Sequence, residues 1–271
     1  MRTKVSLSFG VINEVLFLEY PKPRFMKKPI LALLFILSLL GCENEDKLTF
    51  GTFELSKTSC QDCPKVQIEL PEALDDTNLT ETINSALQEE VIALLSFEEE
   101  KDIDSVGQAV DSFVANFYDL KEKFQDEVPW EAEIKGDIVY EDTHMLTLVL
   151  NAYVFTGGAH GYNSTSFINF DKLKGTELEN WELFEDEVAF SRFAETKFRI
   201  QEKIPQDENI NVTGFMFDGD VFHLSENIGY VPEGIKLIYN QYEVASYADG
   251  PIVLTIPYAE INKYLKRGIQ L

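Results

Sequence analysis

The chain has 271 residues, enough for one large domain or two small ones with a substantial hydrophobic core. Its 47 acidic and 23 basic residues give a formal net charge of −24. This charge excludes a typical nucleic-acid-binding protein, because phosphate contacts need clustered Lys and Arg side chains.

The first 41 residues differ from the rest of the chain. Lys27 and Lys28 precede an apolar run over residues 30–40, and Gly41 and Cys42 follow it. A basic start, an apolar run too short to span a bilayer comfortably and a small residue at its end are typical of a secretory signal peptide. The ending LLGC resembles the bacterial lipobox, in which the cysteine carries the lipid and becomes the mature N-terminus.

We therefore expect Cys42 to be the lipidation site and residues 26–41 to be a lipoprotein signal peptide. Residues 1–25 are then an upstream extension from a mis-called start codon, and residues 42–47 are an acidic tether. The alternative is a signal anchor that is never cleaved. The predicted location is the bacterial cell envelope, either periplasmic or surface-exposed.

Cleavage before Cys42 changes the charge of the chain. It removes six basic and two acidic residues, which leaves 17 basic and 45 acidic residues and a net charge of −28. Anionic lipid surfaces repel such a protein, so the membrane is expected to be a partner through the lipid anchor only.

Two further cysteines, Cys60 and Cys63, form a C-x-x-C pair. In an exported protein a structural disulfide is the default, because the compartment is oxidising. Redox chemistry would need a helix N-terminus to activate the thiol, whereas the residues that follow alternate as in a strand. A shared metal site is the third alternative.

The hydrophobic pattern predicts both helices and strands. Apolar residues recur at three- and four-residue spacing, as in amphipathic helices, over residues 77–95, 105–124, 187–203 and 258–266. Strand-like segments are expected over residues 48–59, 65–73, 131–140, 145–155, 162–170, 214–225, 234–246 and 251–261. This order lacks a regular βαβ alternation and favours an α+β fold of antiparallel sheets with packed helices. Two small domains that share an interface are expected, over residues 48–170 and 171–271.

Four stretches together resemble one known family. They are YVFTGGAHGYNSTSFINFD, ELENWELFED, FMFDGDVFHL and YNQYEVASYADGPIVLTIPYAEI. They look like the extracytoplasmic region of RsiV-type anti-sigma factors, over about Leu48 to Leu265. The resemblance implies a domain also found in the peptidoglycan deacetylase PdaC, followed by an RsiV-type C-terminal domain of unknown function. In RsiV the similar region recognises lysozyme, which makes a lysozyme-like ligand an expectation here.

The sequence also departs from those families. It shows no sigma-binding segment, no interior transmembrane run and no deacetylase module with its Asp and His metal-ligand motifs. The lysozyme-contacting residues of the family cannot be matched one by one. No functional residue is therefore carried over from the resemblance.

The stretch TGGAHG, residues 156–161, is the first candidate site. Its glycines suit a hairpin corner, because glycine adopts a positive φ without a Cβ clash. If the stretch binds a ligand, Gly157 and Gly158 would offer backbone N–H groups beside His160 and Tyr162. Such a polar and aromatic surface suits a sugar or a protein.

Catalysis by this stretch would need further functional groups beside its histidine. His160 would require an orienting carboxylate and either a nucleophile or a metal. The sequence has three histidines, none at metal-ligand spacing: His144, His160 and His223. We therefore expect no catalytic residue, no metal and no cofactor.

The stretch YNQYEVASYADGP, residues 239–251, is the second candidate site. Tyr242 and Tyr247 lie near Asn240 and Gln241 in the sequence and would make an aromatic binding surface. In an unbroken strand, however, Tyr242 points away from Tyr239 and Tyr247, so one shared surface needs a bulge. Purely structural use is the alternative.

Two acidic runs are candidate calcium sites, FEEEKDID over residues 97–104 and DGD over residues 218–220. The EF-hand ligand pattern is absent, so a solvated acidic face and a simple turn are the expected roles.

These features predict a non-catalytic envelope lipoprotein that acts as a binding or sensing module for a cell-wall-associated ligand. The expected partner is a basic protein such as lysozyme, which an acidic surface would steer toward itself, or a cell-wall glycan. One alternative is a peptidoglycan- or glycan-acting enzyme centred on His160. The other is a structural subunit of an envelope assembly.

Overall fold

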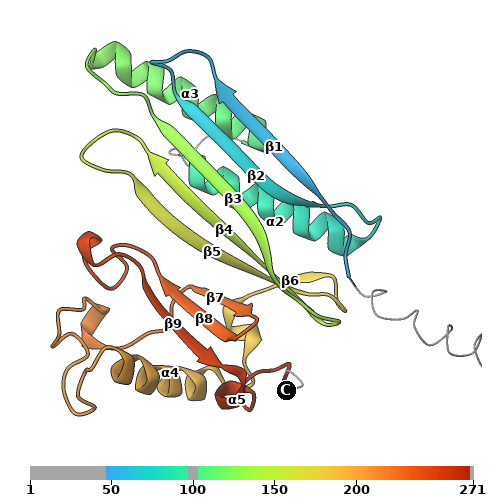
Figure 1. Ribbon diagram of the computed structural model, residues 1–271, viewed down its shortest axis with the longest axis vertical. Helices are drawn as coiled ribbons and strands as arrows, with labels where there is room; N and C mark the ends of the chain where they lie inside the picture. Colours follow the sequence, from blue (N-terminus) through green and yellow to red (C-terminus); the bar gives the residue numbers. More distant parts are fainter. Residues whose placement is uncertain (1–46, 97–102, 269–271) are drawn as a thin grey trace, which may run out of the picture. The chain divides into compact units, whose positions relative to one another are not determined.

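The computed structural model of this protein describes residues 47–96 and 103–268. Within these ranges the chain forms a six-stranded sheet, a three-stranded sheet and packed helices (Figure 1). None of the described helices is long and apolar enough to cross a membrane. The expected signal peptide, the expected lipidation site Cys42 and residues 97–102 of the first acidic run lie outside the described residues.

The six-stranded sheet has the order β1-β2-β3-β4-β5-β6. Its strands are β1 (Phe50–Thr58), β2 (Lys65–Ala73), β3 (Glu131–Glu141), β4 (Met145–Phe155), β5 (Tyr162–Asp171) and β6 (Thr176–Leu178). Neighbouring strands are antiparallel except β2 and β3, which are parallel. A parallel pair needs a long crossover, and the two helices between β2 and β3 provide it. The predicted α+β class is confirmed, with this one parallel pair as a difference.

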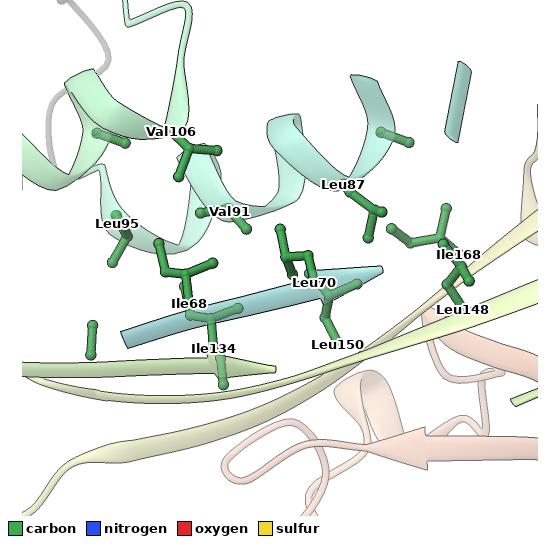
Figure 2. Close-up of a cluster of buried hydrophobic side chains, with 14 of the residues drawn as sticks. Ile68, Leu70, Leu87, Val91, Leu95, Val106, Ile134, Leu148, Leu150 and Ile168 are labelled. Carbon is green, nitrogen blue, oxygen red and sulfur yellow. The ribbon is translucent and has the colours of Figure 1, made fainter. Parts of the chain in front are cut away.

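Helices α2 (Asn78–Leu95) and α3 (Val106–Lys123) cover one face of this sheet. Each begins after a capping hydroxyl: the Thr77 side chain accepts from the Thr80 N–H, and the Ser105 side chain accepts from the Gln108 N–H. Figure 2 shows apolar side chains of both helices above Ile68 and other sheet residues, which together form the first core. Both expected helices are confirmed nearly to the residue. They could be predicted because their apolar residues have helical spacing.

The three-stranded antiparallel sheet contains β7 (Asn227–Val231), β8 (Gly234–Tyr239) and β9 (Ile252–Pro257). Helices α4 (Glu187–Gln201) and α5 (Tyr258–Ile261) pack against it and close a second core. Three short 3-10 helices lie in the connections: η1 (Asn180–Leu183), η2 (Asp218–Asp220) and η3 (Tyr247–Asp249).

Three expected elements of this second part are wrong. Residues 214–225 form no strand; they contain η2 within irregular backbone, and Phe217 and Phe222 are buried against Phe198. The apolar and aromatic content of residues 214–225 resembled that of a strand because a loop supplies core side chains here. The strand expected over residues 234–246 ends at Tyr239, and the terminal helix expected over residues 258–266 ends at Ile261.

The two sheets are joined by buried polar and apolar contacts. Asn169 on β5 accepts a hydrogen bond from the Thr147 hydroxyl at 2.8 Å and donates to the Ile228 carbonyl on β7 at 2.7 Å. A Cβ added to Gly229 would lie 2.5 Å from the Phe167 ring, so β7 approaches β5 closely. The shared interface that the sequence predicted is present.

Candidate functional site

Residues 156–161 connect β4 and β5 as the corner of an antiparallel hairpin. Gly157 and Gly158 have φ values of 94° and 83°, in the left-handed region that glycine tolerates best. A Cβ on Gly157 would also collide with the Glu127 carboxylate. The predicted hairpin corner is therefore confirmed, and its glycines set its geometry.

Gly161 ends this corner and lies flat against the ring of Tyr153 on β4. A Cβ at position 161 would lie within 2.7 Å of the Tyr153 hydroxyl oxygen. The close contact brings the backbone of the corner down onto the outer face of the sheet, which is the face opposite α2 and α3.

We expect Gly161→Ala to lower the free energy of unfolding by about 1–3 kcal/mol, because the Tyr153 ring must leave its position. Gly158→Ala is the matched comparison, since a Cβ there meets nothing within 4 Å and only the positive φ opposes it. Urea unfolding of both variants checks this. Equal costs at the two positions would contradict a packing role for Gly161.

The second candidate stretch is attached to the edge of β5 by two side-chain amides. Asn240 accepts from the Thr165 N–H at 2.9 Å and donates to the Thr165 carbonyl at 3.0 Å. Gln241 accepts from the Asn163 N–H at 3.4 Å. β6 pairs only with the last three residues of β5, so these amides satisfy backbone groups on the part of the edge that β6 does not reach.

As a result the two candidate stretches, about eighty residues apart in sequence, meet in one aromatic cluster, which consists of His160, Tyr242 and Tyr247. The rings of His160 and Tyr247 stack at 3.8 Å between centroids. Tyr242 lies 5.5 Å from Tyr247 and 6.4 Å from His160, again measured between centroids. The Tyr247 hydroxyl donates to the Gly161 carbonyl at 3.1 Å, which fixes the cluster to the hairpin corner.

The hydrogen bonds of His160 define its tautomer. Its Nδ1 lies 3.0 Å from the Gly161 carbonyl oxygen, and a carbonyl only accepts, so Nδ1 carries the proton. In the neutral ring Nε2 is then an acceptor, and the Tyr242 hydroxyl donates to it at 3.3 Å. Both ring nitrogens are thus occupied, and neither partner is a carboxylate.

Tyr242 and His160 are the exposed members of the cluster, whereas Tyr247 is half-buried. Tyr242 is 57% exposed, and its φ of 71° is unusual for a residue with a large side chain. Such backbone conformations persist where the surroundings impose them, and they are concentrated at functional sites. Tyr242 is therefore the residue of the cluster most suited to contact a ligand.

The other predicted site residues lie elsewhere. Tyr162 alternates with the outward-facing Asn163, so it lies on the helix side of β5, 39% exposed, where burial and the nearby Glu243 raise the pKa of its phenol. Tyr239 is fully buried and donates to the His223 carbonyl at 2.7 Å. Chain reversal after Tyr239, rather than a bulge within a strand, brings Tyr242 and Tyr247 together.

Cys60 and Cys63 form a disulfide in the tight turn between β1 and β2, with Cα atoms 5.1 Å apart. The Tyr118 hydroxyl lies 3.3 Å from the Cys63 sulfur. The DGD segment is a turn, in which Gly219 and Asp220 have positive φ and Asp220 accepts from Asn211. In residues 47–96 and 103–268, no group of three or more His, Cys, Asp or Glu side chains could hold a metal ion.

Two successive parts of the chain are similar to two known domain families. Residues 58–163 match the family described as Deacetylase PdaC, and residues 181–259 match the family described as Protein of unknown function (DUF3298). This order is the one that the resemblance to RsiV-type proteins predicted. No functionally curated protein matches the chain.

Solved structures share the fold. A crystal structure of a DUF3298 family member from Bacteroides fragilis superposes with a TM-score of 0.64 at 22% identity, covering 83% of this chain and 96% of that one. A DUF3298 family protein from Pseudomonas aeruginosa gives a TM-score of 0.63 at 20% identity, covering 82% and 96%. At these identities the likeness establishes the fold alone.

Proposed function

We propose that this protein is a non-catalytic module of the bacterial envelope that binds a cell-wall-associated ligand through the aromatic cluster. The observation that carries the proposal is the cluster itself, because two distant segments converge to display Tyr242 in a strained backbone conformation. In this proposal the lipid on Cys42 holds the module at a membrane, and the acidic tether separates the two.

The hydrogen bonding of His160 supports binding over catalysis. A general base needs an acceptor nitrogen that faces a substrate and a second group that orients the ring. In His160 the acceptor nitrogen is taken by the Tyr242 hydroxyl and the other nitrogen by a backbone carbonyl. The ring is instead used as a stacking surface for Tyr247.

The specific ligand we propose is a basic protein of the lysozyme type. A chain with a formal net charge of −24 attracts such a protein over long distances and raises its association rate. Exposed tyrosines that are held rigidly are typical centres of protein interfaces, since they bury a large area at a small cost in side-chain entropy.

Equilibrium titration of the chain from Glu43 onward with hen-type lysozyme, over a series of salt concentrations, tests this proposal. That fragment retains the compact unit Asp46–Leu271. We expect binding that survives moderate salt and a Kd that rises by about 30-fold in Tyr242→Ala, as for a central interface tyrosine. Phe124→Ala is the matched control, because Phe124 is 61% exposed at the end of α3.

Two results would contradict the protein ligand. One is binding that disappears in moderate salt and is equal in both variants, which would indicate non-specific electrostatic attraction between an acidic and a basic protein. The other is an equal loss of binding in Phe124→Ala.

A further inference from the structure

We infer that the outer face of the six-stranded sheet binds an oligosaccharide that carries free amino groups, laid across strands β1 to β5 with one end at the aromatic cluster. The inference rests on the proposed non-catalytic binding role but not on its protein ligand.

The strand registers place polar side chains in two parallel rows on this face. The first row, in strand order, is Ser56, Gln67, Glu133, Tyr153 and Asn163. The second row is Glu54, Glu69, Lys135, Asn151 and Thr165. Neighbouring strands are about 4.8 Å apart, so each row spans roughly 19 Å. That length accommodates several linked sugar rings.

The face is hollowed and open where the rows begin. A cavity of about 390 Å³ lies on the helix side of the sheet, but a separate hollow of about 310 Å³ lies on the outer face of β1, β2 and β3. It is lined by side chains from both rows, including Gln67 and Glu133. In Figure 1 no helix covers the outer face of these three strands, whereas α2 and α3 lie behind them.

The hydrogen-bonding groups of this face are available to a ligand. The side chains of Ser56, Gln67 and Asn163 are exposed and make no hydrogen bond within the part of the chain that the structure describes. Amide and hydroxyl groups of this kind can each donate and accept, which matches the hydroxyl groups of a sugar.

The charges of the face select the kind of sugar. The hollow is lined by three carboxylates, Glu54, Glu69 and Glu133, and by one ammonium group, Lys135. Glu54 stands directly opposite Glu69 on the neighbouring strand, and like charges placed in this way repel each other. Lys135 stands opposite Glu69 on the other side and offsets one carboxylate, which leaves a negative charge that a bound cation would compensate. A sugar amine is such a cation, and an N-acetylated sugar is not.

The aromatic cluster lies at the β4–β5 end of the first row. Tyr153 of the first row lies against Gly161, whose carbonyl accepts from Tyr247 and from His160. Tyr242 contacts both His160 and Tyr247, and its exposed ring offers a flat surface on which a sugar ring stacks. A cationic peptide would use the carboxylates and the ring equally well, but the hydroxyl groups of a sugar also match the uncharged amide and hydroxyl groups of the first row.

The test compares three probes of matched size at a mildly acid pH that keeps sugar amines charged. They are a glucosamine tetrasaccharide, its fully N-acetylated counterpart and a lysine tetrapeptide. With the full compact unit, we expect the glucosamine probe to bind at least about ten-fold more tightly than either of the others, because only it matches both charge and stacking.

Three variants then separate the contributions. The double variant Glu69→Gln, Glu133→Gln should remove the preference for the amine form and leave the N-acetylated probe unchanged. Tyr242→Ala should weaken both sugars by a similar factor, about ten-fold. Glu122→Gln on α3 removes one exposed carboxylate from the opposite layer and should change neither.

Several results would overturn the inference: equal binding of the two sugars, binding of the lysine peptide as tight as that of glucosamine, or an equal loss in Glu122→Gln. Titrating the same variants with lysozyme keeps the two proposals distinct. A preserved glucosamine preference without lysozyme binding would reject the protein ligand alone. Absence of binding to the three probes while lysozyme binds would reject this inference alone, and absence of binding to all four ligands would reject the binding role together with it.

Discussion

Replacing Asp171 with alanine is expected to lower the free energy of unfolding by about 3 kcal/mol, near the lower end of the range for a broken buried ion pair. The Asp171 side chain is 1% exposed and forms an ion pair with Arg267 at 2.5 Å. It also accepts from the backbone N–H groups of Leu173 and Lys174 at 3.0 and 3.1 Å. Alanine leaves these donors without their acceptor, while Arg267, 30% exposed, regains water.

The pH dependence of this loss provides its control. Burial raises the pKa of Asp171, but the hydrogen bonds from Arg267, Lys174 and Leu173 outweigh it and hold the pKa below the ordinary value of 3.8. A lowered pKa in the folded state means that the stabilisation is present above the ordinary value and is lost as pH falls through the folded-state pKa.

We therefore expect the stability difference between the parent protein and Asp171→Asn to be constant near neutral pH and to shrink below about pH 3.8. Urea unfolding at several pH values measures it. A difference that stays the same down to the lowest pH at which the parent folds would show that the carboxylate charge contributes nothing.

Gly234→Ala is expected to destabilise the protein at least as much as Asp171→Ala, lowering the free energy of unfolding by about 3 kcal/mol or more. An added Cβ would collide with the Ile256 carbonyl oxygen and would lie 2.7 Å from its carbon and 2.9 Å from the Pro257 Cα. These are backbone atoms of β9, which cannot rotate away as a side chain would. The substitution must therefore push β8 and β9 apart at the point where β8, the central strand of the three-stranded sheet, begins.

Gly107→Ala is the control for this prediction. Gly107 lies in the first turn of α3, and a Cβ there meets nothing within 4 Å. We expect it to raise the free energy of unfolding by up to about 1 kcal/mol, because alanine favours the helix. Urea midpoints of the two variants measure the contrast, and a loss of stability in both would point to the assay and not to the β8–β9 contact.

The helices and most strands could be predicted because their information is local. Thr77 and Ser105 supply capping oxygens immediately before apolar stripes of helical spacing, so each helix start is set within four residues of sequence. The strands β4 and β5 are rich in β-branched and aromatic residues and flank the glycine-rich corner at residues 156–161. Features of this kind are visible without knowledge of the partner strand.

The errors arose where the tertiary structure decides the local conformation. The strand β8 stops at Tyr239 although the residues after it continue a strand-like pattern, because Asn240 hydrogen-bonds to the backbone of Thr165, 75 residues away. Residues 214–225 are rich in apolar and aromatic side chains, as a strand is, but they place Phe217 and Phe222 in the second core from an irregular segment. No local pattern separates such a loop from a strand.

The residues of the candidate site could be identified from the sequence, but their proximity in space could not. Both stretches attract attention by composition, with glycines beside His160 in one and three tyrosines in the other. An unbroken strand would have kept Tyr242 and Tyr247 on opposite faces. Asn240, which was expected only to lie near the site, brings the two stretches together through its hydrogen bonds to the Thr165 backbone.

The strand β4 contributes to both hydrophobic cores. Leu146, Leu148 and Leu150 fill the first core from one side of the strand, and Met145 at its start enters the second. Neither core is closed without this strand, and β5, which ends at Asp171, carries the polar contact to β7. Because the two halves share this strand, we expect them to unfold together, so that a substitution deep in one half also destabilises the other.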